Sequence, residues 1–327
     1  VGYQAGSANT TGVALNAFGM QALQANTTGA GNSAFGGYHV GQYNAALYSN
    51  TTGNYNSAFS SGALANNTTG SSNVAMGWAA LTSNTTADYN TGVGYQSLYS
   101  NTTGSNNTAY GATSLYANTT GTLNTGLGQS TLRYNTTGSY NTAVGLQALF
   151  NNTTANNNTA VGYQALYAYN GSTGGNTAVG YNCGSANTTG NYNTYLGGSA
   201  GNGITTGSNN IYIGYNAYQS SASVSTEIVL GYSIGGKGGD TAFIGGSSGA
   251  YNGANTTTWS TTSDQRLKKN IVDNNDGLDK INAIRVRNFE YRLPEEVDAE
   301  LKPTDAINKA GVQLGVIAQE QIGRAHV

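Results

Sequence analysis

The sequence predicts an all-β fold, a parallel β-roll or β-solenoid of about 13 coils with a period of 17 residues. Three observations predict it: ladders of repeated residues, residue types that disfavour helix, and a very low content of charge. Charged residues make up 8% of the 327 residues, against about 25% in typical proteins. The chain holds 48 Gly and 24 Tyr but only 2 Pro. This composition is unlike that of a globular domain, a charged disordered chain or a flexible linker.

Four ladders, all in phase, define the period. An N-T-T-G or N-T-T-A tetrad recurs every 17 residues over residues 50–152, and a second Asn ladder runs over residues 56–158. A Leu ladder spans residues 47–166 and a Gly ladder spans residues 77–162. After one inserted residue the second Asn ladder resumes at Asn176. Such self-similarity is the signature of a repeat architecture.

The residue types within each unit favour strands and turns. Seventeen residues are too few for a helix pair, and Thr, Asn and Gly are poor helix formers. We expect residues 141–149 to form two short strands hinged at Gly145, with Ala143 or Val144 pointing inward beside Leu149. We expect the tetrad to form the other corner, with Asn and Gly in left-handed conformations.

Stacking of the coils would turn each ladder into a column of identical side chains. At about 4.8 Å per coil, about 13 coils give a rod of roughly 60 Å. The predicted interior is thin, so we expect several identical chains, most simply three, to bundle and bury further apolar columns. The residues that follow the Leu ladder form such a column: Tyr99, Tyr116, Phe150 and Tyr167.

Charge and composition exclude several function classes. The formal net charge is −2, and the only cations among the first 260 residues are Arg133 and Lys237, so we expect no nucleic-acid partner. No apolar run approaches the length of about 18 residues that spans a bilayer. Cys183 is the single cysteine, which excludes an internal disulfide framework. No cofactor site and no metal site is expected. No signal peptide is visible, and because the chain begins with Val1 we expect its true N-terminus to be missing.

Two departures from the period stand out. The spacing between Asn26 and Asn50 is 24 residues, so seven residues are inserted around His39. Insertions in solenoids form loops on one face, and this one is either a tolerated surface loop or a loop that contacts a receptor. The β-roll is expected over residues 1–234, and a glycine-rich connector over residues 235–260.

The string N-T-A-V-G-Y-Q-A-L-Y at residues 158–167 resembles the head repeats of trimeric autotransporter adhesins and of phage tail fibres. The resemblance implies a left-handed parallel β-roll that forms a homotrimer. It covers residues 1 to about 234 and says little about any ligand.

The composition changes after residue 260. The first 260 residues hold only five charged side chains, and all the other charged residues of the chain follow them. Apolar spacing predicts a helix near residues 278–284. Residues 286–291 alternate as in a strand, and residues 313–319 predict a second short strand or the start of a helix. This segment, residues 261–321, is therefore expected to be α+β.

The run S-D-Q-R-L-K-K-N-I at residues 263–271 resembles the start of the intramolecular chaperone domain of phage tail spikes and endosialidases. The later G-V-I-A-Q-E, residues 315–320, resembles that family's second block. The family folds as a trimer, guides assembly of the fibre and then cuts itself off. The resemblance implies a Ser–Lys dyad with Ser263 as nucleophile, Lys268 as base and cleavage between Ser263 and Asp264.

The chemistry of such a dyad requires these residue types. A serine hydroxyl is a weak nucleophile until a base takes its proton, and a lysine is such a base only when its pKa is lowered. Arg266 and Lys269 are candidates for the cationic field that lowers the pKa of Lys268. In the alternative interpretation, Arg266 and Lys268 merely pair with carboxylates such as Asp264.

The last six residues, I-G-R-A-H-V at 322–327, equal a peptide that a common sequencing adapter encodes. We therefore expect them to be an artefact, the chaperone domain to be truncated, and self-cleavage, the only enzyme activity predicted, to be absent from this fragment.

These observations predict a structural fibre that binds a host cell-surface glycan or protein receptor, located in a virion tail. One alternative is a bacterial surface adhesin of the trimeric autotransporter type. An ice-binding solenoid is disfavoured, because adjacent threonines in a strand point to opposite faces. A glycan-cleaving enzyme is disfavoured because Asp88, Glu227 and Asp240 lie in different coils and form no pair.

Overall fold

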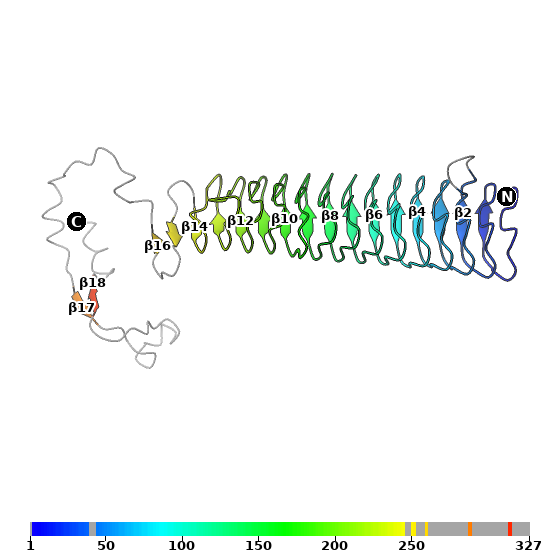
Figure 1. The fold of residues 1–327 in the computed structure, drawn as a ribbon, viewed down its shortest axis with the longest axis horizontal. Coiled ribbons are helices and arrows are strands. Elements are labelled where there is room, and N and C mark those ends of the chain that lie inside the picture. Colours follow the sequence, from blue (N-terminus) through cyan, green and yellow to red (C-terminus); the bar gives the residue numbers. More distant parts are fainter. Residues whose placement is uncertain are drawn as a thin grey trace, which may run out of the picture. The chain divides into compact units, whose positions relative to one another are not determined.

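The computed structural model describes residues 2–38, 44–245, 250–252, 259–260, 287–289 and 313–315. The chain divides into two units, residues 1–263 and 264–327. The first unit is a parallel β-solenoid (Figure 1), which confirms the predicted fold class. Its described residues contain no helix.

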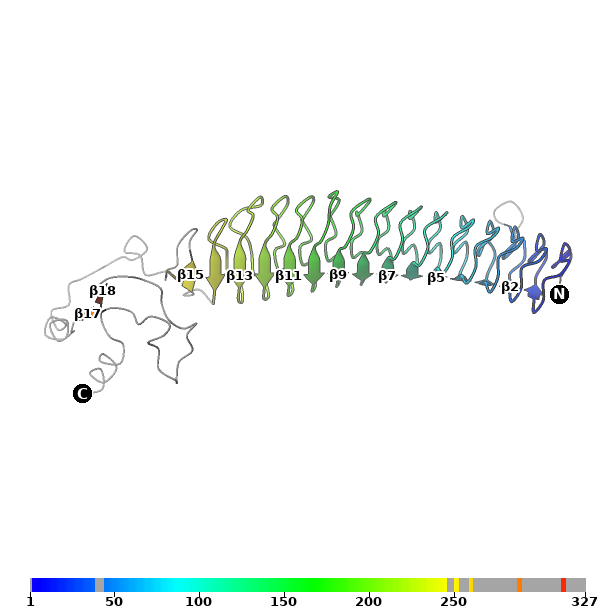
Figure 2. The ribbon, with the colours of Figure 1, turned by 90° about the horizontal axis from the view of Figure 1, so that it is seen from below.

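Each coil contributes one strand of three residues to a single sheet, and Figure 2 shows these strands in a row along the stack. Strands β1 to β14 pair in parallel with the next strand along the chain. They are β1 Asn16–Phe18, β2 Ser33–Phe35, β3 Ser57–Phe59, β4 Val74–Met76, β5 Thr91–Val93, β6 Thr108–Tyr110, β7 Thr125–Leu127, β8 Thr142–Val144, β9 Thr159–Val161, β10 Thr177–Val179, β11 Thr194–Leu196, β12 Ile211–Ile213, β13 Ile228–Leu230 and β14 Ala242–Ile244. Two antiparallel strands, β15 (Ala250–Asn252) and β16 (Trp259–Ser260), follow β14.

The register places each residue on its own copy in the next coil. Thr142 pairs with Thr159 across one regular coil, and Thr159 pairs with Thr177 across a coil with one extra residue. Ser33 pairs with Ser57 although seven residues are inserted between them, so the insertion leaves the ladder intact. A shorter coil joins Ile228 to Ala242. The parallel ladder therefore continues to β14, inside the segment that the sequence predicts as a connector.

The prediction of two strands per coil is wrong, because the segment after the hinge glycine is a series of turns. Gly145 has the positive φ expected of the hinge, but Gln147 and Leu149 are also left-handed, with φ of 58° and 51°. The N–H groups of these two left-handed residues point to opposite neighbouring coils. The N–H of Gln147 donates to the carbonyl of Gln129 in the preceding coil, and that of Leu149 to Ala165 in the following one. Leucine rarely adopts positive φ, and here hydrogen bonds to both neighbouring coils hold it there.

The tetrad corner also differs from expectation, because none of its glycines is left-handed. Close packing explains them instead: a Cβ added to Gly104 would lie 2.3 Å from the carbonyl oxygen of Gly121. Ala87 and Ala155 hold the same place in two coils. The contact is therefore tight, yet small backbone shifts admit a methyl group.

Two buried asparagine ladders link the coils. The first begins each tetrad: Asn67 Nδ2 donates to Asn50 Oδ1 at 2.8 Å and to the carbonyl of Gly70 at 2.8 Å. In the second ladder, Asn73 donates its N–H to Asn56 Oδ1 at 3.0 Å and its Nδ2 to the carbonyl of Ala87 at 2.8 Å. Buried amides need such partners, and bonds between equivalent asparagines and to backbone carbonyls supply them along both ladders, except at Asn152 Oδ1, where the first ladder ends. These bonds fix the stacking register.

The core is a column of leucines beside small residues from the strand centres. Leu115 and Leu149 are fully buried, as is Ala143 at the centre of β8. Near the C-terminal end of the solenoid the large and the small residue exchange columns. Gly201 occupies the position of the leucines, and Tyr195 occupies the strand centre, where most coils have alanine or glycine. A Cβ on Gly201 would lie 2.3 Å from the ring of Tyr195. The width of the interior is thus kept constant by opposite changes in two columns.

We predict that Leu115→Asp strongly destabilises the solenoid. Leu115 is fully buried, so the change removes apolar packing and buries an unpaired carboxylate, at a cost of about 3 kcal/mol or more in the free energy of unfolding. Thr120→Asp is the matched control, because Thr120 is exposed. Denaturant titrations followed by circular dichroism measure both. If Leu115→Asp unfolds at the same midpoint as the parent, the core assignment is wrong.

Candidate functional site

The second unit contains a two-stranded antiparallel sheet. Strand β17 (Arg287–Phe289) pairs with β18 (Gln313–Gly315), with Asn288 opposite Leu314. Strand β17 lies in residues 286–291, which the sequence predicts as a strand, and β18 lies in residues 313–319, which it predicts as a short strand or the start of a helix. Gly315 both ends β18 and begins the G-V-I-A-Q-E block.

The residues predicted to carry chemistry or to contact a receptor lie outside the described part of the chain: Ser263, Asp264, Arg266, Lys268, Lys269 and His39. The Ser–Lys dyad, the cleavage site and the receptor loop therefore stay predictions from the sequence. The same holds for the helix expected near residues 278–284.

The outer surface of the sheet carries an uninterrupted apolar column. In each of the strands β1 to β14 the central residue points inward, so the third residue points outward. Tyr110, the third residue of β6, is 60% exposed. The column consists of Phe18, Phe35, Phe59, Met76, Val93, Tyr110, Leu127, Val144, Val161, Val179, Leu196, Ile213, Leu230 and Ile244. We call it the sheet column.

A second, interrupted column follows the hinge glycines: most of its side chains are apolar or aromatic, but Gly37, Ser61, Gln129 and Gly198 break it. Its rings stack between coils, with centroids 5.2 Å apart for Trp78 and Tyr95 and 5.3 Å apart for Tyr163 and Tyr181. Tyr232 at its C-terminal end is 72% exposed. The continuous sheet column, widened by the second column where the latter is aromatic, is an apolar face of a length that is unusual for a surface that meets only water.

The sequence predicts that a different apolar column, the residues that follow the Leu ladder, is buried between chains, and this stays a prediction. The rings of Tyr99 and Tyr116 are half-buried and stack at 5.1 Å, as do those of Phe150 and Tyr167. They largely pack on one another. The signal that would have identified the sheet column is an apolar residue directly before each hinge glycine.

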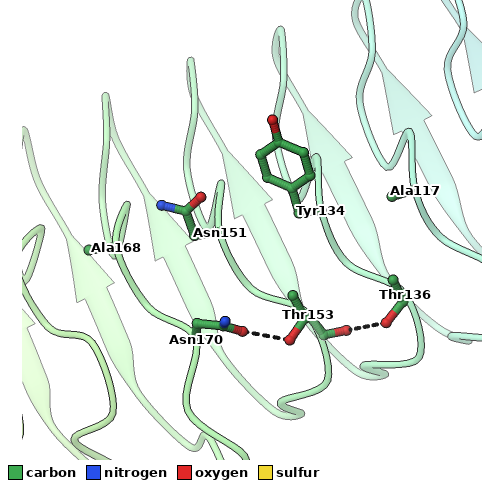
Figure 3. Close-up of a pocket in the computed structure, with 7 residues that line it drawn as sticks. All are labelled: Ala117, Tyr134, Thr136, Asn151, Thr153, Ala168 and Asn170. Carbon is green, nitrogen blue, oxygen red and sulfur yellow. Dashed lines mark hydrogen bonds between the residues drawn. The ribbon is translucent and has the colours of Figure 1, made fainter.

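A groove runs along the side of the solenoid where each coil ends and the next tetrad begins (Figure 3). Its volume is about 480 Å³. It spans four successive coils, and its lining residues are Ala117, Tyr134, Thr136, Asn151, Thr153, Ala168 and Asn170. No residue of this set is charged.

The buried carboxylate of Glu227 stands where the second asparagine ladder ends. Its N–H donates to Asn210 Oδ1, as an asparagine there would. Its carboxylate accepts hydrogen bonds from the hydroxyl of Tyr212 at 2.9 Å and from the N–H groups of Ser220 and Gly238 at 3.1 and 2.8 Å. These three hydrogen bonds satisfy the buried carboxylate and link the last coils to one another. Among the described residues no group of three or more His, Cys, Asp and Glu side chains could hold a metal ion.

Burial also shapes the ionisation of the cysteine and of inward tyrosines. Burial raises the pKa of the Cys183 thiol from 9.0 to about 12, and raises that of Tyr169 from 10.0 to about 12. Burial, and next the charge of Glu227, raise the pKa of Tyr212 still further. A thiol with so high a pKa is not a reactive nucleophile.

Comparison with known protein families gives one result, for the C-terminal unit. Residues 263–322 match the family described as the chaperone of endosialidase. The matched segment includes both sequence blocks noted above and both strands, β17 and β18. It supports the resemblance of this segment to the intramolecular chaperone.

Neither the curated proteins nor the solved structures contain a match to the chain. Within the described residues, no helix has the length and apolar character needed to cross a membrane.

We predict that the solenoid loses stability in alkali. Below about pH 9 the Cys183 thiol is protonated in both the folded and the unfolded chain. As pH rises from about 9 to about 12 only the unfolded chain ionises, so this contribution to stability is lost, and Tyr169 acts in the same direction. Denaturant titrations across this pH range measure the loss.

Cys183→Ala is the matched control, because Ala148, Ala165 and Ala200 fill the same place in other coils. The variant should lose less stability in alkali than the parent. The parent should also resist alkylation by iodoacetamide at about pH 8 until it is unfolded. Alkylation of the folded chain at the rate of a free thiol would contradict the burial of Cys183.

Proposed function

We propose that this chain belongs to a homotrimeric fibre of the phage tail type, whose C-terminal segment directs trimer assembly and then cleaves the chain. The observation that carries the proposal is the match of residues 263–322 to the chaperone of endosialidase, directly after a parallel β-solenoid. The solenoid is the fibre shaft, and a receptor on the host surface is its partner.

The apolar face of the solenoid supports assembly into a trimer. The sheet column runs from Phe18 in β1 to Ile244 in β14 without a charged residue. Exposed apolar columns of this length favour burial against another protein surface. A second copy of the same chain offers a column with the same spacing between rows, so identical rows of side chains can pack along the whole stack.

A chaperone domain suits the requirements of such a fibre. Many nearly identical coils allow two chains to pair in a shifted register, because a shift by one coil places similar residues together. A domain that gathers three chains at one end sets the starting register. Cleavage at Ser263, with Lys268 as the base, would then release the domain and make assembly irreversible. The location that follows is a virion tail.

The proposal predicts an elongated trimer in analytical ultracentrifugation of the full chain. The double variant Leu127→Lys, Val144→Lys places like charges in the sheet column and should give monomers, since unpaired charges are costly in a contact. Tyr140→Lys is the matched control, because Tyr140 is 59% exposed and lies outside the column. A monomeric parent, or a double variant that stays trimeric, would contradict the assigned interface.

The proposal also predicts self-cleavage when the chaperone segment is joined at its C-terminus to the C-terminal part of a relative that cleaves itself. Mass spectrometry should find Asp264 at the new N-terminus. Ser263→Ala removes the nucleophile and Lys268→Ala removes the base, so each should abolish cleavage while trimers still form. Continued cleavage before Asp264 in Ser263→Ala would refute the dyad.

A further inference from the structure

Three departures from the repeat occur together near the middle of the solenoid. The last residue of each coil is small or an amide in most coils, as in Ser83, Ser100 and Ala117, but in one coil it is Tyr134. The residue before it, Arg133, is one of only two cations among the described residues of the solenoid. Two coils later, Tyr169 and Asn170 replace the first two residues of the tetrad. The groove of about 480 Å³ lies at this place.

Tyr134 is held in position but keeps an open surface. The guanidinium carbon of Arg133 lies 5.8 Å from the centroid of the Tyr134 ring. The ring of Phe150 meets the Tyr134 ring edge-on, with centroids 5.0 Å apart and an interplanar angle of 84°. Arg133 is itself fixed by a hydrogen bond from Nη1 to Thr113 Oγ1 at 2.9 Å. Yet 44% of Tyr134 is exposed. The ring is therefore a rigid aromatic platform on the groove wall, which limits the entropy lost when a ligand packs on it.

The polar groups of the groove are available to a ligand. Thr136 and Thr153 use their hydroxyls as donors to the next coil, to the carbonyl of Thr153 and to Asn170 Oδ1 respectively. The side-chain amide of Asn151, the Nδ2 of Asn170 and the hydroxyl of Tyr134 make no hydrogen bond to the described residues. Figure 3 shows Tyr134 and Asn151 along one side of the groove and the threonines with Asn170 along the other.

We propose that this groove binds a saccharide, with the apolar face of a pyranose ring packed on Tyr134 and its hydroxyl or acetamido groups bonded to Asn151 and Asn170. The volume lies in the range of small-ligand sites, about 300–1,000 Å³. An apolar platform with a few neutral amides matches a sugar, which has one apolar face and many neutral hydroxyls. Ala117 and Ala168 at the two ends leave room for neighbouring sugar units.

The groove and the sheet column come from different segments of each coil. The groove is built after the Leu ladder and at the start of the tetrad, and none of its residues belongs to a strand. In Figure 3 the strands lie behind the labelled side chains. Contacts between copies through the sheet column thus use none of the groove residues. The inference rests on the proposed function, because it names the receptor of that fibre as a glycan.

The test is a printed array of bacterial lipopolysaccharide and capsular oligosaccharides, probed with the full chain. A retained oligosaccharide is then titrated by calorimetry against the parent and variants. Tyr134→Ser, which introduces the residue found at this place in earlier coils (Ser83 and Ser100), should weaken binding by about tenfold or more. Tyr134→Phe keeps the ring and should retain most of the affinity. Asn151→Ser should weaken binding, and Tyr140→Ser, an exposed tyrosine outside the groove, should not change it.

Circular dichroism of each variant checks that the solenoid is intact. The inference is overturned if the parent retains no oligosaccharide, or if Tyr134→Ser binds as tightly as the parent. This failure is distinct from failure of the proposed function. A trimer that binds no oligosaccharide refutes only the groove, whereas a monomeric parent refutes the fibre.

Discussion

Axial hydrogen bonding between equivalent positions is the constraint on which the rest of this solenoid depends. Each coil has one three-residue strand and no helix among its described residues, so little holds it together alone. Buried amides of the tetrads find one partner within the coil and another in a neighbouring coil, as when Asn67 donates both to the carbonyl of Gly70 and to Asn50. Every other feature follows from keeping that register: the identical rows, the narrow core and the columns on the surface.

The columns predicted correctly are those made by one residue type. The buried leucines, the two asparagine ladders and the hinge glycine at Gly145 were all predictable, because repetition shows which positions must not vary. The turn segment was not, because left-handed Leu149 looks like any strand leucine in the sequence. Only the hydrogen bonds to two neighbouring coils reveal why that conformation is stable. The exchange of leucine and tyrosine in the core was equally hidden, since it is a correlation between two columns.

The candidate site was only partly predictable for a related reason. The groove consists of exceptions to the repeat, and a repeat analysis treats exceptions as noise. Tyr134 was visible as an aromatic residue among small ones, but its relation to Asn151 and Asn170 depends on the stacking of three coils. The Ser263–Lys268 dyad is the opposite case. Its residues follow from a resemblance that the match to residues 263–322 supports, while the geometry lies outside the described residues.

Because each coil contacts only its neighbours, the number of coils encoded by the gene for this solenoid can change without disturbing the rest of the fold. A duplication or loss of 17 codons adds or removes one whole coil and leaves every remaining contact of the same kind. The reach of the protein then changes in steps of one strand spacing, about 4.8 Å. A coil can be added or removed without loss of packing only where the coils that become neighbours have the same residues in the core. Joining a leucine coil to one built around Gly201 and Tyr195 would bring two large or two small residues together. Recombination can therefore vary the length of the leucine-filled part of the solenoid, while its tyrosine-filled end is inherited as a block.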